Sequence, residues 1–162
     1  MIASCRPAAE ADIEPITALR SAAYPNDTHK PIGPQLPNLY VAQTADDVVG
    51  YGRLRHHRAP RFNPAGYYLG GVVVDPAWRR HGIGTMLTEC RIEAAWAAGA
   101  EIVYYFANSR NEASIAMHRD FGFVELRRPF EFPGVRFEGG VGVLFGLTRN
   151  HAGPGTAQPT CS

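Results

Sequence analysis

The stretch that decides the fold covers residues 69–87 and reads Leu-Gly-Gly-Val-Val-Val-Asp-Pro-Ala-Trp-Arg-Arg-His-Gly-Ile-Gly-Thr-Met-Leu. Its β-branched run of three valines predicts the last part of a strand, which Asp75-Pro76 ends. Gly82-Ile83-Gly84 then opens a helix that we expect to continue to Ala98. The stretch therefore predicts a strand, a basic turn, a glycine turn and a helix, in that order.

Arg79, Arg80 and His81 lie between this strand and this helix. The first N–H groups of a helix have no intrahelical partner and carry the positive end of the helix dipole, so they bind anions. Glycine lets a ligand come close to the backbone because it has no Cβ. The turn therefore predicts a site for a phosphate chain, although an ordinary tight turn has similar residues. The spacing matches neither a P-loop nor a dinucleotide fingerprint.

The composition is that of one globular domain. The chain has 162 residues, of which 45% are hydrophobic and 19% charged, and its net charge is +1. This charge balance gives no reason to expect a nucleic-acid or anionic-membrane partner. No apolar stretch approaches the roughly 20 residues that span a bilayer, and the first residues lack the pattern of a signal peptide.

The three cysteines, Cys5, Cys90 and Cys161, lie far apart in the sequence. An odd number without paired spacing predicts neither a disulfide framework nor a zinc site, and it favours a reducing, cytoplasmic setting. We expect Cys90 to be a small residue of the core. No metal site is expected.

Hydrophobic periodicity predicts one mixed α+β domain over residues 1–150. We expect a single central twisted sheet of about seven strands flanked by helices. Gly70-Gly71 is expected to be a bulge or a place where a ligand approaches the backbone, and Gly99 is expected to end a helix. Asp12 is expected to cap the first helix. Residues 151–162 have no apolar period and predict a disordered tail. The expected strands are 2–6, 39–43, 48–55, 67–74, 102–107, 123–127 and 141–147, the helices are 12–23, 82–98 and 111–122, and the long loops are 25–38 and 129–140.

Two motifs resemble signatures of the GNAT superfamily of N-acetyltransferases. The first is Val72-x-Val74-x-Pro76-x-x-Arg79-x-x-Gly82-x-Gly84-x-x-Leu87, which is similar to the family's acyl-CoA signature. The second is Asn111-x-x-Ser114-Ile115-x-Met117-His118-x-x-Phe121-Gly122-Phe123. Arg6-Pro7-Ala8 followed by Asp12 is similar to a frequent opening of these proteins. The resemblance covers about residues 2–147.

The resemblance implies direct transfer of an acetyl group from acetyl-CoA to an amine. It assigns backbone contacts with the pantetheine arm and the acetyl carbonyl to the strand, the pyrophosphate to the turn, and the CoA arm to two residues of the second motif. The residues implied to bind acetyl-CoA are Val72, Val73, Val74, Arg79, Arg80, His81, Gly82, Ile83, Gly84, Thr85, Asn111, Ser114 and His118. Members often form homodimers, but this sequence identifies no interface.

The catalytic residues depart from the family pattern. His118 occupies the position of the family's usual tyrosine acid, and it is either a general acid or a residue that packs near the thiol. No acid lies on the strand 67–74, where many relatives carry a glutamate base, so no base is assigned. His56, His57, Tyr104 and Tyr105 are the nearby candidates. Asp75 is expected to cap its turn, and Glu101 to lie at the wrong end of the sheet.

The acceptor pocket is predicted from residues 25–38, His56, His57 and the loop 129–140. Phe130, Phe132 and Phe137 could wall it, with Glu131 and Glu138 attracting a cationic amine, or the aromatic rings could simply fix the loop to the sheet. The expected acceptor is an amine of a small molecule or peptide. The alternatives are a protein N-terminus or lysine, and a non-catalytic acyl-CoA sensor.

Overall fold

The computed structural model describes residues 3–28, 30–59 and 62–149. The predicted tail lies outside them, so the boundary after residue 150 stays a prediction. The elements follow the order β1 (Ser4–Pro7), η1 (Glu10–Asp12), α1 (Ile13–Ala23), η2 (Gly33–Asn38), β2 (Leu39–Gln43), β3 (Val48–His57), β4 (Gly66–Val74), η3 (Pro76–Trp78), α2 (Ile83–Ala97), β5 (Ile102–Asn108), α3 (Glu112–Asp120), β6 (Val124–Phe130) and β7 (Gly142–Thr148).

The seven strands form one mixed sheet in the order β1-β2-β3-β4-β5-β7-β6, which confirms the predicted architecture. β4 and β5 are the parallel pair, because the chain crosses over through α2 between them, and the other pairs are antiparallel. β3 and β6 continue two to three residues past their predicted ends. Part of the predicted loop 25–38 forms the 3₁₀ helix η2.

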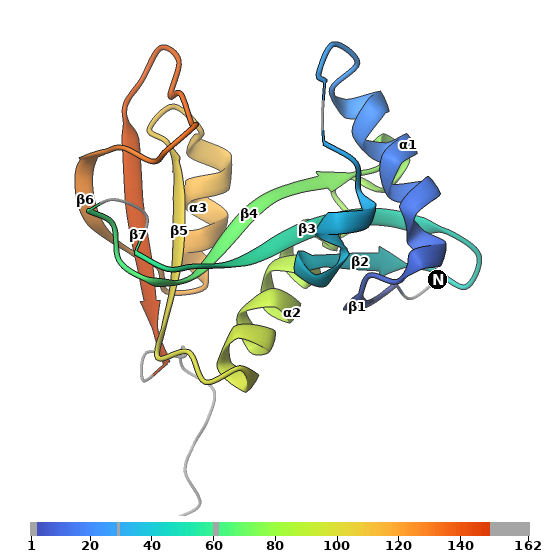
Figure 1. Ribbon diagram of the computed structural model, residues 1–162, viewed down its shortest axis with the longest axis horizontal. Coiled ribbons are helices and arrows are strands. Elements are labelled where there is room, and N and C mark those ends of the chain that lie inside the picture. The colour runs from blue at the N-terminus through green and yellow to red at the C-terminus, as the bar shows by residue number, and fades with distance from the viewer. Residues whose placement is uncertain (1–2, 29, 60–61, 150–162) are drawn as a thin grey trace, which may run out of the picture.

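The helices cover opposite faces of the sheet (Figure 1). α2 and α3 pack on one face, where Ile92, Ala95 and Ile115 join the largest buried cluster with residues of β4, β5 and β7. α1 packs on the other face, where Ile16 meets apolar residues of β2, β3 and β4. Beyond α1, an aromatic cluster from β4, β5 and β6 continues the core on that same face.

The end of α2 has the predicted glycine, whereas the start of α1 lacks the predicted side-chain cap. Gly99 has a φ of +91°, and Gly99 and Ala100 donate to Trp96 and Ala95, which is a Schellman ending and confirms the prediction. Asp12 precedes α1, but its carboxylate does not cap that helix. The predicted cap is therefore wrong.

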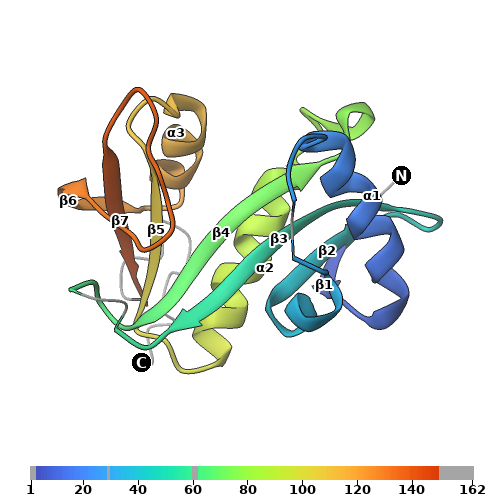
Figure 2. The same ribbon diagram turned by 45° about the horizontal axis from the view of Figure 1, so that its top comes forward.

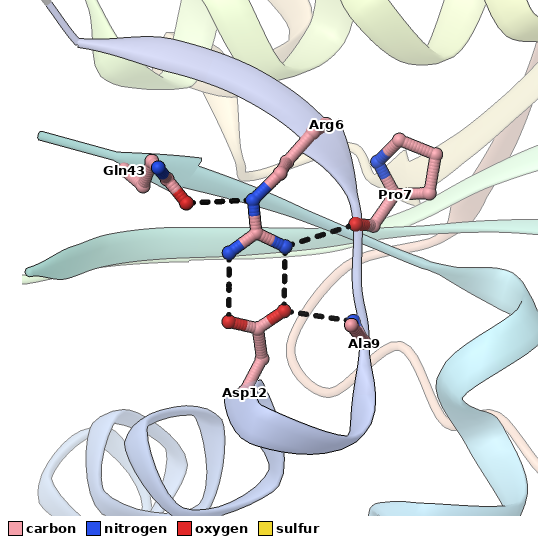
Figure 3. A network of polar contacts seen from close by, with 5 residues as sticks. All are labelled: Arg6, Pro7, Ala9, Asp12 and Gln43. Atoms are coloured by element: carbon pink, nitrogen blue, oxygen red, sulfur yellow. Dashed lines mark hydrogen bonds and ion pairs between the residues drawn. The ribbon is translucent and has the colours of Figure 1, made fainter.

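Asp12 instead closes a polar network that ties β1 to the start of α1 (Figure 3). Both of its oxygens accept from Arg6, at 2.7 and 2.9 Å, and one also accepts from the Ala9 N–H. Arg6 continues the network to Gln43 on β2. The hydrogen bonds from Arg6 hold the pKa of Asp12 below its usual value.

Cys5 and Cys90 form a disulfide in the structure, so the expectation of unpaired cysteines is wrong. The two residues are 85 positions apart in sequence, and they meet because β1 and α2 both pack beside β2. Such a pair leaves no spacing signal along the chain. With this disulfide present, the cysteines no longer favour a reducing compartment.

Candidate active site

β4 and β5 part from each other in the middle of the sheet. They pair through Tyr67–Val103, Tyr68–Tyr104 and Leu69–Tyr105, and within the described chain no further pair continues the ladder. The two strands then diverge, as both views show (Figures 1 and 2). Residues 70–74 of β4 therefore carry backbone groups without a strand partner on the β5 side, and we call the position after Leu69 and Tyr105 the vertex.

A β-bulge lies at the vertex, as the Gly70-Gly71 pair predicted. Gly52 of β3 pairs with Val72 of β4, and Leu54 pairs with Leu69. Between these two pairs β4 has two residues where β3 has one, so the extra residue of the bulge lies on β4. A Cβ on Gly70 would lie 2.8 Å from the Arg53 side chain, whereas one on Gly71 would meet no atom within 4 Å. Gly71 is exposed although it lies mid-strand in the centre of the sheet. The bulge therefore presents open backbone where the strands part.

The valines after the bulge differ in their packing. Val73 is buried on the α1 face, whereas Val72 and Val74 pack against the cluster around the first turn of α2. Their pairing with β3 through Gly50, Tyr51 and Gly52 leaves their other edge unpaired.

The turn before α2 has the open backbone that an anion site needs. Arg80 and Gly82 have φ values of +64° and +77°, and the Met86 N–H is bonded to the Gly82 carbonyl. The N–H groups of Ile83, Gly84 and Thr85 are thus in the first turn, where intrahelical acceptors are lacking. A Cβ on Gly82 or Gly84 would meet nothing within 4 Å.

The side chains of this turn also suit an anion site. Arg79, Arg80 and His81 are exposed, whereas Ile83 is buried and anchors the helix. His81 donates from Nδ1 to the Arg79 carbonyl, which stabilises the turn. Asp75 accepts from the Ala77 N–H and caps η3, as predicted. The residues present therefore fit a pyrophosphate group.

The second motif places its polar residues at the start of α3, facing β5. Asn111 caps the helix by accepting from the Ser114 N–H. The Ser114 hydroxyl is hydrogen-bonded to the Tyr105 hydroxyl at the vertex. His118 donates from Nδ1 to the Ser114 carbonyl at 2.7 Å, because a carbonyl oxygen can only accept.

The His118 ring is buried, with 4% of its surface exposed. Burial lowers its pKa to about 4, the hydrogen bond to Ser114 opposes this, and the charge of Arg91 lowers the pKa further. Near neutral pH the ring is therefore neutral, with its proton on Nδ1 and a lone pair on Nε2. Of the two roles that the sequence leaves open, this geometry fits a packing residue whose Nε2 can accept a hydrogen bond better than it fits a general acid.

The aromatic residues of the loop 131–141 pack against the sheet and also line a hollow. Phe132 lies 4.7 Å from Phe106 between ring centroids, and Phe130 is fully buried. A hollow of about 860 Å³ is nevertheless lined by residues of this loop and of the β3–β4 connection, including Phe132, Phe137, Glu131 and Glu138. The described residues of the predicted segment 25–38 do not line it.

The two candidate histidines of β3 face opposite sides of the sheet. The His57 ring meets Tyr68 and Phe132 on the aromatic side, and burial and Arg55 lower its pKa. The His56 ring meets Tyr67. His57 pairs with Gly66, three residues before the vertex, which is roughly 10 Å at 3.3 Å per residue. The backbone of His57 therefore lies well away from the vertex. Glu101 precedes β5, at the end opposite the diverging strands, as expected.

Arg91 is a residue of this region that the sequence reasoning missed. It is fully buried on α2 and reaches the bulge through a hydrogen bond to the Gly70 carbonyl. The signal was present, because Arg91 follows the core residue Leu87 by four positions and so falls on the buried face of the helix.

Within the described residues no cluster of acidic, histidine and cysteine side chains could hold a metal. No described helix has the length and hydropathy of a membrane span.

Several solved structures that resemble this chain in fold are acetyltransferases. A GNAT-family acetyltransferase from Bacillus cereus superposes with a TM-score of 0.73 at 15% identity, covering 91% of this chain and 98% of that one. A putative acetyltransferase from Salmonella typhimurium, solved with its cofactor acetyl-CoA, superposes with a TM-score of 0.70 at 22% identity, covering 96% and 99%.

The sequence also matches the model of the acetyltransferase (GNAT) family over residues 10–123, and the chain belongs to this family. The N-alpha-acetyltransferase RimI of Mycobacterium tuberculosis is 36% identical over 97 residues, which are 57% of this chain and 58% of that protein. An uncharacterized protein of Mycobacterium leprae is also 36% identical, over 99 residues that make up 59% of this chain and 26% of its own length. The chain thus matches between a quarter and three fifths of these relatives.

Proposed function

We propose that this protein transfers the acetyl group of acetyl-CoA to a primary amine of a small molecule or peptide. The observation that carries the proposal is the vertex, where an exposed glycine bulge and an unpaired strand edge precede a basic turn and an open helix N-terminus. This is a continuous run of donors that can hold an acyl thioester at one end and a phosphate chain at the other.

The proposed cosubstrate contacts follow the chain. The first-turn N–H groups of Ile83, Gly84 and Thr85 bind the pyrophosphate, with Arg79 and Arg80 adding charge. The pantetheine arm lies along the unpaired edge of Val72, Val73 and Val74. It forms hydrogen bonds with the backbone there, as an added β-strand would. Asn111 and Ser114, at the start of α3, lie on the side where β5 diverges.

The proposed reaction is attack of a neutral amine nitrogen on the thioester carbonyl. The carbon–nitrogen bond forms, the carbon–sulfur bond breaks, and the amine loses one proton while the thiolate gains one. Backbone N–H groups at the bulge stabilise the negative charge on the carbonyl oxygen. Because no described acid lies on β4, a water chain removes the amine proton or the amine arrives neutral.

The thiolate proton is assigned to the hydroxyl pair of Tyr105 and Ser114. These groups lie at the vertex and at the start of α3, and each can pass a proton to the other. His118 supports the pair by stacking on Tyr105 and by holding the Ser114 carbonyl. The family tyrosine of α3 is thereby replaced by a tyrosine that β5 supplies.

A second candidate acceptor is the α-amino group of a protein N-terminus. The likeness to RimI supports it, because that relative is an N-alpha-acetyltransferase. The hollow at the loop 131–141 also supports it, since its aromatic wall continues to Phe106, the residue after Tyr105. A chain laid along this wall would bring its end toward the vertex.

The test is thiol release from acetyl-CoA across a panel of small amines, amino sugars, polyamines and N-terminal peptides. Acetylated product is identified by mass spectrometry. Turnover with small amines would select the first candidate, and turnover confined to peptides that copy protein N-termini would select the second. Tight acetyl-CoA binding without turnover on any acceptor would overturn the enzyme proposal in favour of a sensor.

A further inference from the structure

Arg91 is a buried cation that has no anionic partner among the residues that the structure describes. None of its surface is exposed, and all four of its hydrogen bonds go to neutral oxygens. Among the described residues, no carboxylate forms an ion pair with it. Burying an unpaired charge is unfavourable, because the guanidinium loses its hydration without gaining a counter-ion. The sequence nevertheless keeps the charge at this position.

The guanidinium group is placed at the bulge. Its Nη1 donates to the Arg53 carbonyl of β3 at 2.8 Å and to the Gly70 carbonyl of β4 at 3.0 Å. Both acceptors fall inside the register shift between the Gly52–Val72 and Leu54–Leu69 pairs, where the regular ladder is interrupted. Arg91 therefore holds the two strands together where the bulge separates their pairing.

Neighbouring residues make room for this contact and anchor it. A Cβ on Gly52 would lie 3.0 Å from the Arg91 Cζ, so a glycine on β3 lets the guanidinium reach the strands. At the other end, Nε donates to the Leu87 carbonyl and Nη2 to the Thr88 hydroxyl. Burial lowers the pKa of Arg91 to about 10, so it stays charged at neutral pH.

The Gly70 carbonyl and the Gly71 N–H belong to one peptide unit. The only cis peptide among the described residues is Arg128–Pro129, so this unit is trans, and its N–H points away from the carbonyl and from Arg91. A cation that binds a peptide carbonyl polarises the unit and makes its N–H a stronger donor. That N–H belongs to Gly71, the exposed residue at the vertex.

We propose that Arg91 is a positioning residue: it fixes the β4 bulge, and its charge strengthens the Gly71 N–H as a donor to the acetyl carbonyl. This rests on the proposed function, because it requires the thioester to lie at the vertex. Beyond that function, the guanidinium of Arg91 acts on the substrate only through the Gly70–Gly71 peptide unit and does not touch the substrate itself.

The first measurement is the carbonyl stretch of acetyl-CoA labelled with ¹³C at the acetyl carbonyl, bound without an acceptor. In the unaltered protein we expect the stretch to move to lower frequency, because the carbonyl is polarised. Arg91→Met should return it toward the free value, and Arg91→Lys, which keeps the charge, should restore part of the shift.

Kinetics with an accepted amine provide the second measurement. We expect Arg91→Met to lower kcat roughly tenfold or more, with a smaller change in KM for acetyl-CoA, because the polarised donor acts mainly on the transition state. A variant that only loosened the fold would lower the melting temperature without moving the carbonyl stretch of the bound population.

Gly52→Ala keeps the charge but adds a methyl group 3.0 Å from the Arg91 Cζ, which pushes the guanidinium against the bulge, so it serves where Arg91→Met fails to fold. It should give part of the same loss of carbonyl shift. The proposal is overturned if bound acetyl-CoA shows no shift in the unaltered protein, or if either folded variant keeps the full shift and kcat. Absence of acetyl-CoA binding in the unaltered protein would instead overturn the proposed function.

Discussion

The ring of His118 lies flat on the ring of Tyr105, with centroids 3.5 Å apart and planes 4° from parallel. This contact joins α3 to β5 at the point where β5 parts from β4. It buries the imidazole and leaves the Tyr105 hydroxyl at the vertex, bonded to Ser114. In the proposed mechanism His118 is thus a neutral support, and Tyr105 supplies a hydroxyl group.

Unfolding should depend on pH through His118. Its pKa is about 4 in the folded protein and near 6.5 unfolded, so between these values the unfolded chain binds the proton. The stabilisation is fully present above about pH 6.5 and is lost as the pH falls toward 4, by about 3 kcal/mol in all.

His118→Phe retains the stack and removes this titration. Urea unfolding at pH 4.5 and pH 7.5 should show a smaller difference between the two pH values in the variant than in the unaltered protein. An equal difference in both proteins would show that the buried imidazole does not titrate as the structure indicates.

Tyr105→Phe tests the proposed proton donor. It keeps the ring against His118 and removes the hydroxyl, so kcat should fall by roughly a hundredfold when thiolate departure limits the rate. KM for acetyl-CoA should change little. Tyr104→Phe is the matched control, because Tyr104 stacks on Tyr68 on the opposite face. Full activity in Tyr105→Phe would remove the hydroxyl pair from the mechanism.

Replacing Arg79 and Arg80 with alanine tests the pyrophosphate site. The double variant should raise KM for acetyl-CoA at least tenfold, since charge-assisted contacts contribute roughly 1.5–3 kcal/mol each. KM for S-acetyl-pantetheine, which has no pyrophosphate, should stay unchanged. Arg128→Ala is the control, because that arginine pairs with Glu125 on β6. Equal effects on both thioesters would place the phosphates elsewhere.

Asp12→Asn should destabilise the protein at neutral pH by about 1–3 kcal/mol, because it weakens a buried acceptor of Arg6 and Ala9. The pKa of Asp12 is lowered in the folded protein, so its contribution is present above the unfolded value near 3.8 and is lost below it. Thermal unfolding of both proteins should therefore converge as the pH falls to 3 and below. A constant gap would mean that the charge of Asp12 is not what stabilises the network.

Much of the fold was predictable because its signals are local. The valine run, the glycine turn and the helix periodicity each depend on neighbours within a few residues, and the bulge at Gly70-Gly71 follows from two adjacent glycines in a strand. The end of α2 at Gly99 is equally local. These features are decided by backbone sterics and by hydrogen bonds between near neighbours.

The contacts that define the site were decided by tertiary structure. Sequence patterns placed His118 in a catalytic position, but its charge state depends on Tyr105, Phe123 and Arg91, which come from three other segments. The Cys5–Cys90 disulfide and the reach of Arg91 to Gly70 likewise join residues far apart in the chain.

The sequence by itself therefore determined the order of the elements, the family and the turn that suits a phosphate chain. Only the tertiary structure decided where β4 and β5 part and which ring nitrogen of His118 carries the proton. It also decided that Arg91, which has no ion-pair partner among the described residues, contacts the bulge. The reason is physical. Local propensities act along the chain, whereas pKa values and polarisation depend on distance and burial in three dimensions.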